Sequence, residues 1–360
     1  MSSPSHPLAI LALTSNGVRL GERLREALEG GEVRLIRDNA REEMTALFQA
    51  GRALVCVMAL GIVVRILGPV LGSKRDDPAV VVVDEAGRFA VSVLGGHAAG
   101  ANELTRRVAE ALEAVPVITT ASEALGLPAL DGIGKEWGWK IDPLSQTTQV
   151  LAAAVRGEPI AVYQETGRRD WWEQAGVWPE HIHLASGGGN TPGKPPKLEI
   201  LPPPLSFPEG WAGLVWITDR QIVTSFYPTL ILRPPSLVLG VGCRRGVPGQ
   251  EIEDFFQYLC RTHGFAPLSL GMVATADLKA DEPGLREFAR RHDVSLRTFS
   301  LEELARVADL PTPSERVRAK IGVAGVAEPA ALLAAGASQL LLTKQRGPRI
   351  TMALARRDNA

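Results

Sequence analysis

The sequence predicts an α/β protein with open, mostly parallel sheets in its N- and C-terminal domains and a smaller mixed module between them. In the first and last thirds of the chain, short apolar runs alternate with amphipathic, helix-like segments. The middle differs, because all seven tryptophans lie between Trp137 and Trp216 and 12 of the 26 prolines lie between residues 151 and 240. A length of 360 residues allows two or three domains. We expect domains over residues 1–138, 139–233 and 234–360.

Two segments carry the clearest local patterns of the N-terminal domain. Leu54–Leu60 is continuously apolar, as in a strand covered on both faces. Leu104, Val108 and Leu112 recur every four residues, which is typical of an amphipathic helix. The expected strands are Leu8–Leu13, Val33–Ile36, Leu54–Leu60, Ala79–Val83, Phe89–Leu94 and Val115–Thr119, and the expected helices are one that ends near Leu28, Glu42–Ala50, Ile62–Leu71 and Ala101–Ala114.

The middle module shows short strand-like runs, and a linker is expected near Pro234-Pro235. Beyond it the alternation of strands and helices returns. Strands are expected at Ile160–Tyr163, Leu214–Ile217, Leu230–Leu232, Leu237–Val241, Leu270–Thr275, Val294–Thr298 and Leu340–Leu342, and helices around Ile252–Leu259 and over Pro283–Arg291, Glu302–Val307 and Pro329–Ala335.

Charge and cysteine content exclude several classes of function. The 39 Lys and Arg nearly balance the 40 Asp and Glu, and no basic stripe indicates a nucleic-acid partner. Cys56, Cys243 and Cys260 are widely spaced, which is typical of reduced cytosolic thiols. The N-terminus indicates a first strand rather than a signal peptide, and no apolar stretch reaches membrane-spanning length. We therefore expect a cytoplasmic protein with no membrane partner.

A loop in the N-terminal domain carries the first candidate site. Gly95-Gly96-His97 follows an expected strand and precedes an expected helix, where glycine amides and the helix start favour an anion. His97 could exchange a proton near neutral pH. Asn102 and Glu103 lie in the first turn of that helix. The alternative is a tight turn, a surface histidine and ordinary helix capping.

Charged residues surround the end of the expected helix Ile62–Leu71. Arg65, Lys74 and Arg75 could bind carboxylates, with neighbouring Asp side chains orienting them. The alternative is a solvated ion-pair cluster, which we favour for Arg75.

The C-terminal domain carries a second candidate site. Gly240, Gly242 and Gly246 resemble a dinucleotide fingerprint, but their spacing does not match G-x-G-x-x-G. A strand, a glycine loop and a helix that carry Arg244-Arg245 would still bind a substrate carboxylate.

Two further segments of this domain place charged groups at helix starts. Lys279 and Glu282 follow the expected strand Leu270–Thr275 and could face the same crevice as Arg244. Glu328 precedes Pro329, and like Glu282 it could instead simply favour the dipole of its helix. No cluster of His, Cys, Asp and Glu indicates a metal held by the protein.

Motifs at both ends of the chain resemble the CbiG family of anaerobic cobalamin biosynthesis, cobalt-precorrin-5A hydrolase. The N-terminal motifs are GIVVRILGPVLGSKRDDPAVVVVDE, GGHAAGANELTRRVA and VITTAS, and the C-terminal motifs are GVGCRRGVPGQEI, ATADLKADEPGL and GVAGVAEPAALLAAG. The resemblance implies a cobalt-corrinoid substrate whose δ-lactone is opened and whose two-carbon unit leaves as acetaldehyde, which gives cobalt-precorrin-5B. The substrate carries the cobalt, so no cofactor is implied. Transient contacts with other cobalamin-pathway enzymes would fit such a role.

The resemblance implies a role for each candidate residue in lactone opening. His97 or Glu103 would handle protons, while the Gly95 and Gly96 amides would face the oxyanion. The substrate would lie between the N- and C-terminal domains. A corrinoid carrier without catalysis and a nucleotide-dependent α/β enzyme are the alternatives. The substrate-binding residues expected are Arg65, Lys74, Gly95, Gly96, Asn102, Gly242, Arg244, Lys279, Glu282 and Glu328.

Overall fold

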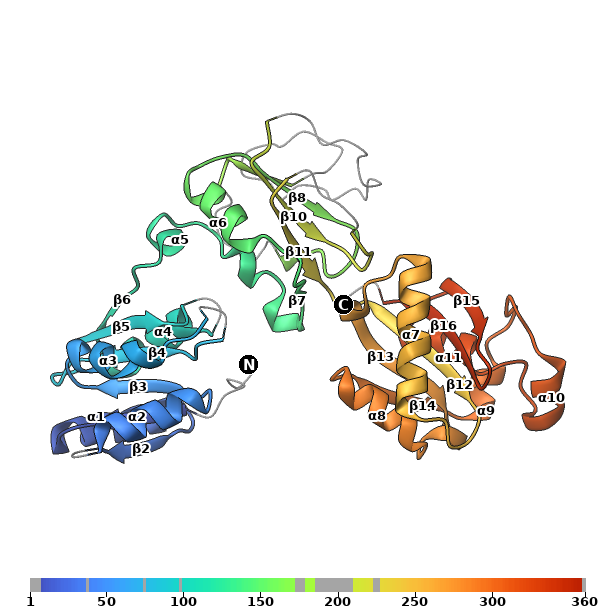
Figure 1. Cartoon of the computed structure of the whole chain (residues 1–360), viewed down its shortest axis with the longest axis horizontal. Helices are drawn as coiled ribbons and strands as arrows, with labels where there is room; N and C mark the ends of the chain where they lie inside the picture. The colour runs from blue at the N-terminus through green and yellow to red at the C-terminus, as the bar shows by residue number, and fades with distance from the viewer. Residues whose placement is uncertain are drawn as a thin grey trace. The chain divides into compact units, whose positions relative to one another are not determined.

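The computed structural model describes residues 8–36, 39–73, 76–96, 99–171, 179–184, 210–222 and 227–357, without the side chains of His183, Leu184, Arg316 and Lys320. The chain divides into two compact units, Met1–Gly132 and Ile133–Ala360 (Figure 1). The described residues form three sheets in which parallel pairs predominate. This architecture confirms the predicted α/β class, while the predicted domain boundaries stay a prediction. Within the described ranges, no helix is long and apolar enough to span a membrane.

The first unit contains a six-stranded sheet with strand order β2-β1-β3-β4-β5-β6. Strands β1 to β4 pair in parallel, β5 runs antiparallel to β4, and β6 is parallel to β5. The strands expected from the sequence are all present, with small shifts at their ends. The elements are β1 Leu8–Ala12, α1 Ser15–Ala27, β2 Glu32–Leu35, α2 Ala40–Gln49, β3 Ala53–Val57, α3 Leu60–Leu67, β4 Val80–Val83, β5 Phe89–Leu94, α4 Ala101–Leu112, β6 Val115–Val117 and α5 Ala121–Ala124.

Helices cover both faces of this sheet, and β3 contributes to a core on each side. Val55 and Val57 pack with residues of α1 and α4 such as Leu24. Leu54 and Cys56 face the opposite side, where α2 and α3 pack. Because successive strand residues point to opposite faces, burial on both sides explains the continuous apolar run.

A tight turn reverses the chain between β4 and β5. The Asp84 carboxylate accepts hydrogen bonds from the backbone amides of Arg88, at 2.7 Å, and Phe89, at 2.8 Å. As a result β5 and β6 end at the edge of the sheet where β1, β3 and β4 begin. The loop after β5 therefore meets the segment before β4, and a Cβ atom at Gly95 would lie 3.0 Å from the carbonyl oxygen of Pro78.

The second unit begins with a five-stranded sheet of order β7-β11-β10-β8-β9, in which only the β7–β11 pair is antiparallel among the described residues. The three strand-like runs of the middle module are thus confirmed as β8, β10 and β11. The elements are β7 Lys140–Ile141, α6 Thr147–Val155, β8 Ile160–Gln164, β9 Ile182–Leu184, β10 Gly213–Ile217 and β11 Thr229–Arg233.

A buried ion pair holds this sheet to the one that follows it. The fully buried Asp219 carboxylate accepts two hydrogen bonds from the Arg356 guanidinium, at 2.7 and 2.8 Å, and one from the Ser236 hydroxyl, at 2.9 Å. Nearby, the buried Arg233 guanidinium donates to the Asp142 carboxylate at 2.8 Å. The predicted linker at Pro234-Pro235 therefore lies between two residues, Arg233 and Ser236, whose side chains are held by hydrogen bonds.

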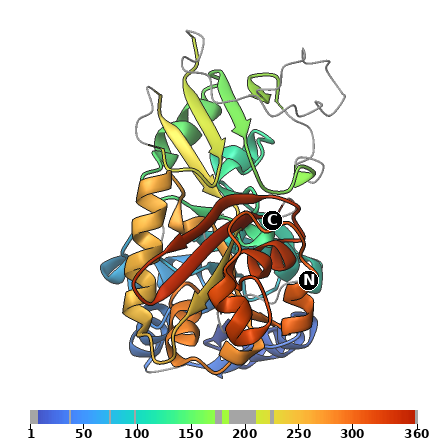
Figure 2. The same cartoon turned by 90° about the vertical axis from the view of Figure 1, so that its right-hand side faces the viewer.

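The last sheet has strand order β14-β13-β12-β16-β15, with the β15–β16 hairpin drawn in red in Figure 2. Strands β12, β13 and β14 are parallel, and β16 is antiparallel to both β12 and β15. No strand was expected from the sequence at Ile350–Arg356, which forms β16. The elements are β12 Leu237–Cys243, α7 Gly249–His263, β13 Leu270–Ala276, α8 Pro283–Arg291, β14 Ser295–Phe299, α9 Leu301–Ala305, α10 Glu315–Ile321, α11 Ala327–Ala335, β15 Leu340–Arg346 and β16 Ile350–Arg356.

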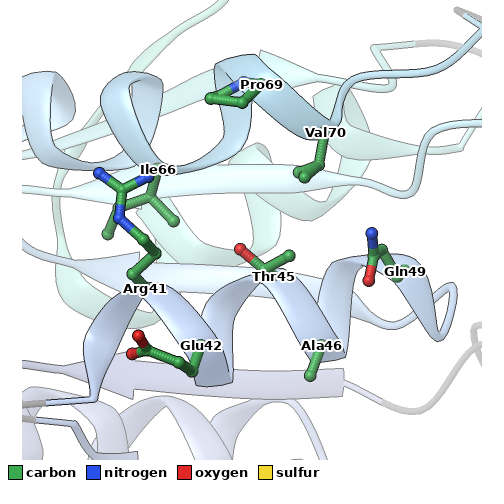
Figure 3. A pocket seen from close by; sticks show the side chains of 8 residues that line it. All are labelled: Arg41, Glu42, Thr45, Ala46, Gln49, Ile66, Pro69 and Val70. Carbon is green, nitrogen blue, oxygen red and sulfur yellow. The ribbon is translucent and has the colours of Figure 1, made fainter.

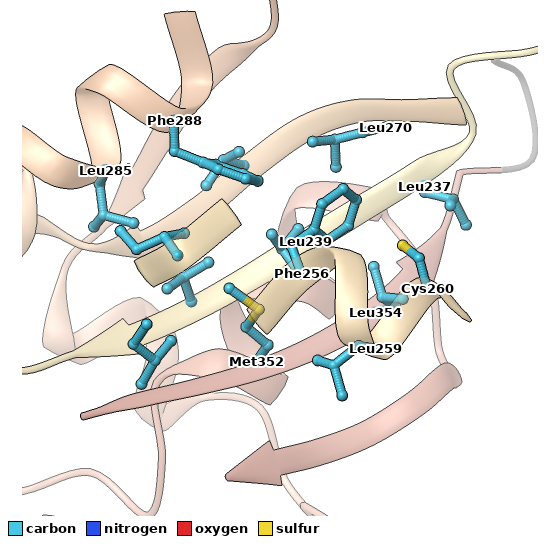
Figure 4. Packing of buried hydrophobic residues seen from close by; sticks show 14 of the residues in the cluster. Leu237, Leu239, Phe256, Leu259, Cys260, Leu270, Leu285, Phe288, Met352 and Leu354 are labelled. Carbon is cyan, nitrogen blue, oxygen red and sulfur yellow. The ribbon is translucent and has the colours of Figure 1, made fainter. Parts of the chain in front are cut away.

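Two different kinds of packing cover the faces of this sheet. On one face, Phe256 of α7 and Phe288 of α8 meet edge to face at 5.5 Å and pack toward Leu239 and Met352 (Figure 4). On the other face, the alanine-rich helix α11 lies very close to β12. A Cβ atom at Gly240 would lie 1.8 Å from the Ala327 carbonyl oxygen, so this approach requires glycine.

Replacing Gly240 by alanine is expected to lower the free energy of unfolding by about 1–3 kcal/mol or more, because backbone atoms of α11 must move. Urea unfolding followed by circular dichroism measures the change. Gly325→Ala is the matched control, since its Cβ atom would meet nothing nearer than 3.7 Å. Equal stability of the two variants would contradict the close packing of α11.

Replacing Asp219 by alanine is expected to lower the free energy of unfolding by about 3–5 kcal/mol, because Arg356 loses its buried partner. Tryptophan fluorescence during urea unfolding follows this part of the chain, which holds all seven tryptophans. Glu287→Gln breaks a solvated pair with Arg291 and serves as the control, with an expected change within about 0.5 kcal/mol. A small loss in Asp219→Ala would show that the pair does not hold the two sheets together.

Candidate functional site

The predicted site residues form two groups, one in each unit. The first group lies at the edge of the first sheet where β5 and β6 end. The second lies at the carboxyl edge of β12 and β13. His97, Lys74 and Arg75 lie outside the described residues.

The local geometry requires glycine at position 95 and leaves little room for a side chain at position 96. Gly95 has φ +74°, and a Cβ atom there would lie 2.7 Å from the Ala99 Cβ. A Cβ atom at Gly96 would crowd Thr120 at 3.2 Å. Their carbonyl oxygens accept hydrogen bonds from the Ala101 and Asn102 amides, at 3.2 and 3.1 Å. Two amides at the start of α4 are thereby used within the protein, so this helix start offers an anion fewer donors than the sequence suggested.

Asn102 acts inside the protein. Its side chain is 2% exposed; Oδ1 accepts from the Ser92 hydroxyl at 2.8 Å, and Nδ2 lies 3.3 Å from the Thr120 hydroxyl and 3.5 Å from the Glu123 carboxylate. These contacts join β5, α4 and the segment after β6. Sequence reasoning missed Ser92, Thr120 and Glu123, although Thr120 lies in the VITTAS motif.

Glu103 and Arg65 are more accessible than Asn102. The Glu103 carboxylate is 69% exposed, and its ion pair with Arg106 is long, at 3.5 Å. Arg106 instead makes its short contact with Glu123, at 2.6 Å. Arg65 is an exposed residue in the last turn of α3, and its guanidinium has no carboxylate partner among the described residues. Both side chains are therefore free to meet a ligand.

An open groove of about 360 Å³ lies between α2 and α3, on the sheet face opposite α4 (Figure 3). Arg41 extends across it from α2 toward Ile66 of α3. None of the predicted site residues that the structure describes lines this groove. We therefore do not assign the site to it.

In the second unit, Glu282 joins two loops. Its nearly buried carboxylate accepts a hydrogen bond from the Gly246 amide at 2.5 Å and one from the Lys279 ammonium at 3.1 Å. Burial alone raises the pKa of this carboxyl, but the Gly246 amide and the Lys279 ammonium outweigh it, so the pKa lies below its ordinary value. Glu282 is therefore held as a carboxylate.

Arg244 and Arg346 supply exposed cations at this edge. The Arg244 amide donates to the Arg349 carbonyl oxygen at 2.9 Å, which fixes its backbone, while its guanidinium extends outward. Strand register pairs Gly242 with Thr351 and Thr351 with Arg346, so Arg346 lies in the same row of the sheet. Within the described ranges neither guanidinium has a carboxylate partner. Sequence reasoning missed Arg346 because it ended that strand at Leu342.

Close packing explains the glycine at position 242, and hydrogen bonds within the protein explain the buried carboxylate of Glu328. A Cβ atom at Gly242 would lie 2.7 Å from the Thr351 hydroxyl, which donates to the Gly242 carbonyl oxygen at 3.1 Å. The Glu328 carboxylate, 1% exposed, accepts from the Thr312 hydroxyl at 2.9 Å and the Lys344 amide at 3.0 Å. Burial lowers the pKa of Lys344, and Glu328 opposes that shift.

The buried and the exposed members of each group therefore differ in what they can do. Asn102, Glu282 and Glu328 join separate segments of the chain, whereas the guanidinium groups of Arg65 and Arg244 have no carboxylate partner among the described residues. Exposed guanidinium groups of this kind bind carboxylates, often through two parallel hydrogen bonds. In the part of the chain that the structure describes, no three His, Cys, Asp or Glu side chains are grouped to hold a metal.

Three family models match successive parts of the chain. Residues 42–123 match "Cobalamin synthesis G N-terminal", residues 128–234 match "Cobalamin biosynthesis central region", and residues 237–355 match "Cobalamin synthesis G C-terminus". The last two matches meet at the linker segment near Pro234-Pro235.

Known proteins are similar over nearly the whole length. Cobalt-precorrin-5A hydrolase of Priestia megaterium is 34% identical, over 96% of this chain and 94% of that protein. Cobalt-precorrin-5A hydrolase of Salmonella typhimurium is 31% identical, over 97% of each. Protein CobE of Sinorhizobium sp is 36% identical over 30% of this chain and 71% of that protein. From these similarities and the three matching models, the chain belongs to the CbiG family.

Proposed function

We propose that this protein hydrolyses cobalt-precorrin-5A in cobalamin biosynthesis. The observation that carries the proposal is the similarity, over nearly the full chain, to two proteins named cobalt-precorrin-5A hydrolase. The exposed, unpaired arginines fit a substrate with many carboxylate arms. In this reaction the δ-lactone opens, the two-carbon unit leaves as acetaldehyde, and cobalt-precorrin-5B is formed.

Opening a lactone requires an activated water, a proton acceptor and donors for the tetrahedral oxyanion. We assign proton handling to His97 and Glu103, and the oxyanion to the Gly95 and Gly96 amides. Two observations support this assignment. The Glu103 carboxylate is reachable, and a hydrogen bond from the Ala101 amide holds the Gly95 carbonyl, which fixes the peptide plane that carries the Gly96 amide.

Substrate binding is assigned to basic side chains. Arg65, Lys74, Arg244 and Lys279 would hold peripheral carboxylates, and Arg346 joins them from its place in the sheet. The cobalt arrives as part of the substrate, so the protein needs no cofactor of its own. A cytoplasmic location and transient contacts with other enzymes of the pathway fit this role. A carrier that binds corrinoids without reaction is separated from the hydrolase by assay.

The proposed function predicts that purified protein converts cobalt-precorrin-5A with release of one acetaldehyde per lactone consumed, measured by an aldehyde assay and mass spectrometry. Replacing His97 by alanine or Glu103 by glutamine is expected to lower kcat by roughly 100-fold or more where the group transfers a proton. Tight binding of unchanged lactone would refute the hydrolase and favour the carrier.

The matched control for Glu103→Gln is Glu110→Gln, because Glu110 is an exposed carboxylate on the same helix, α4. Its kcat is expected to equal that of the unmodified protein. Full turnover in both His97→Ala and Glu103→Gln would show that neither residue is catalytic, while the proposed reaction itself would still stand.

The exposed arginines give a second prediction. Arg244→Gln and Arg346→Gln are each expected to raise KM about tenfold, because each loses one charge-assisted hydrogen bond to the substrate. The value of kcat should change little, because the lost hydrogen bond stabilises the bound substrate and the transition state equally. Arg156→Gln is the control, since Arg156 already pairs with Glu158 at 2.7 Å on the middle module. Unchanged KM in both variants would exclude this edge from substrate binding.

A further inference from the structure

We propose that Glu282 is a positioning residue that sets Lys279 and the Arg244–Gly246 loop in place, rather than a residue that contacts the substrate. This inference rests on the proposed function, because Lys279 is taken to hold a substrate carboxylate. It revises the role expected from the sequence, in which Glu282 binds the substrate directly.

Both carboxylate oxygens of Glu282 are engaged inside the protein. Oε1 accepts from the Gly246 amide and Oε2 accepts from the Lys279 ammonium, and the side chain is only 5% exposed. A substrate rich in carboxylates would be repelled by Glu282 if the two met directly. The Lys279 ammonium separates them and neutralises the charge.

The contacts of Glu282 join the two loops that leave the sheet at this edge. Gly246, at φ +71°, lies in the loop between β12 and α7 that also carries Arg244. Lys279 lies in the turn after β13, and Glu282 occupies the N-cap position of α8 without a capping hydrogen bond from its side chain. The Lys279 side chain remains 20% exposed, and an ammonium has three donors. Lys279 can therefore keep its bond to Glu282 and still donate to a ligand.

Cys243 offers a reporter for this arrangement that needs no substrate. Of the three cysteines, Cys56 and Cys260 are fully buried, and Cys243 alone is partly exposed. Burial raises the pKa of the Cys243 thiol to about 11, with Lys279 acting to lower it and Glu282 to raise it. The reactivity of this thiol therefore depends on both charged groups.

The first test measures the rate at which a small thiol reagent labels Cys243 in the folded, full-length protein. Glu282→Gln and Glu282→Ala are expected to speed labelling roughly threefold to tenfold, because the thiol pKa falls and the loop loosens. Asp281→Asn is the matched control, since that neighbouring carboxylate is 92% exposed and pairs with Arg286. Unchanged labelling in both Glu282 variants would overturn the proposal. Cys243→Ala confirms the site of labelling.

The second test uses kinetics with cobalt-precorrin-5A. Lys279→Met and Glu282→Gln are each expected to raise KM roughly tenfold with little change in kcat, and Glu282→Gln should raise KM by a clearly smaller factor in the Lys279→Met background, where only its hold on the Arg244–Gly246 loop is left to lose. Multiplied effects in the double variant would show that Glu282 acts independently of Lys279, and would overturn the proposal. If the unmodified protein does not convert the substrate, the proposed function fails, while the labelling experiment still tests the link between Glu282 and Lys279.

Discussion

A carboxylate or side-chain amide that is buried away from water must form hydrogen bonds within the protein, and this constraint explains how distant segments of each unit are joined. Asp219 takes donors from Arg356, which follows it by 137 residues. Glu282 takes its donors from the loops after β12 and β13, Glu328 takes its donors from Thr312 before α10 and from Lys344 in β15, and Asn102 joins three elements around the end of β5. Apolar packing builds the sheets and their helices. The paired polar groups decide where the loops at the edges lie, and the candidate site residues are on those loops.

Local periodicity made most of the fold predictable, but it carried no information on strand direction. The apolar runs of Val80–Val83 and Phe89–Leu94 marked two strands, and the register of their pairing shows that they are antiparallel, with the hydrogen bonds of Asp84 holding the turn between them. That reversal moves the Gly95-Gly96 loop to the edge opposite the one expected from a purely parallel sheet. No strand was expected at Ile350–Arg356, although Gly347-Pro348 before it is a turn signal, because the preceding strand was taken to end at Leu342.

The candidate site was predictable as a set of residues and less so as a set of roles. Glycine at 240 and 242 resembled a ligand loop in the sequence, but the contacts of α11 and Thr351 require those glycines for packing. Glu282 and Glu328 resembled exposed helix caps, because their partners come from other segments of the chain. Arg346 carried no motif at all. Its significance comes from strand register, which the sequence does not display.

The two prolines at Pro234-Pro235 are typical of a linker at which a protein can be truncated. The ion pair between Asp219 and Arg356 shows which contacts a truncation there would remove. A fragment that stopped at this segment would retain Asp219 and lose Arg356 and Ser236, leaving an acidic group without its donors. The complementary fragment would expose Phe265, which the Arg220 guanidinium covers at 4.3 Å. A fragment that contains Asp219 should therefore extend through residue 356, so that the buried carboxylate keeps the donors it takes from Ser236 and Arg356.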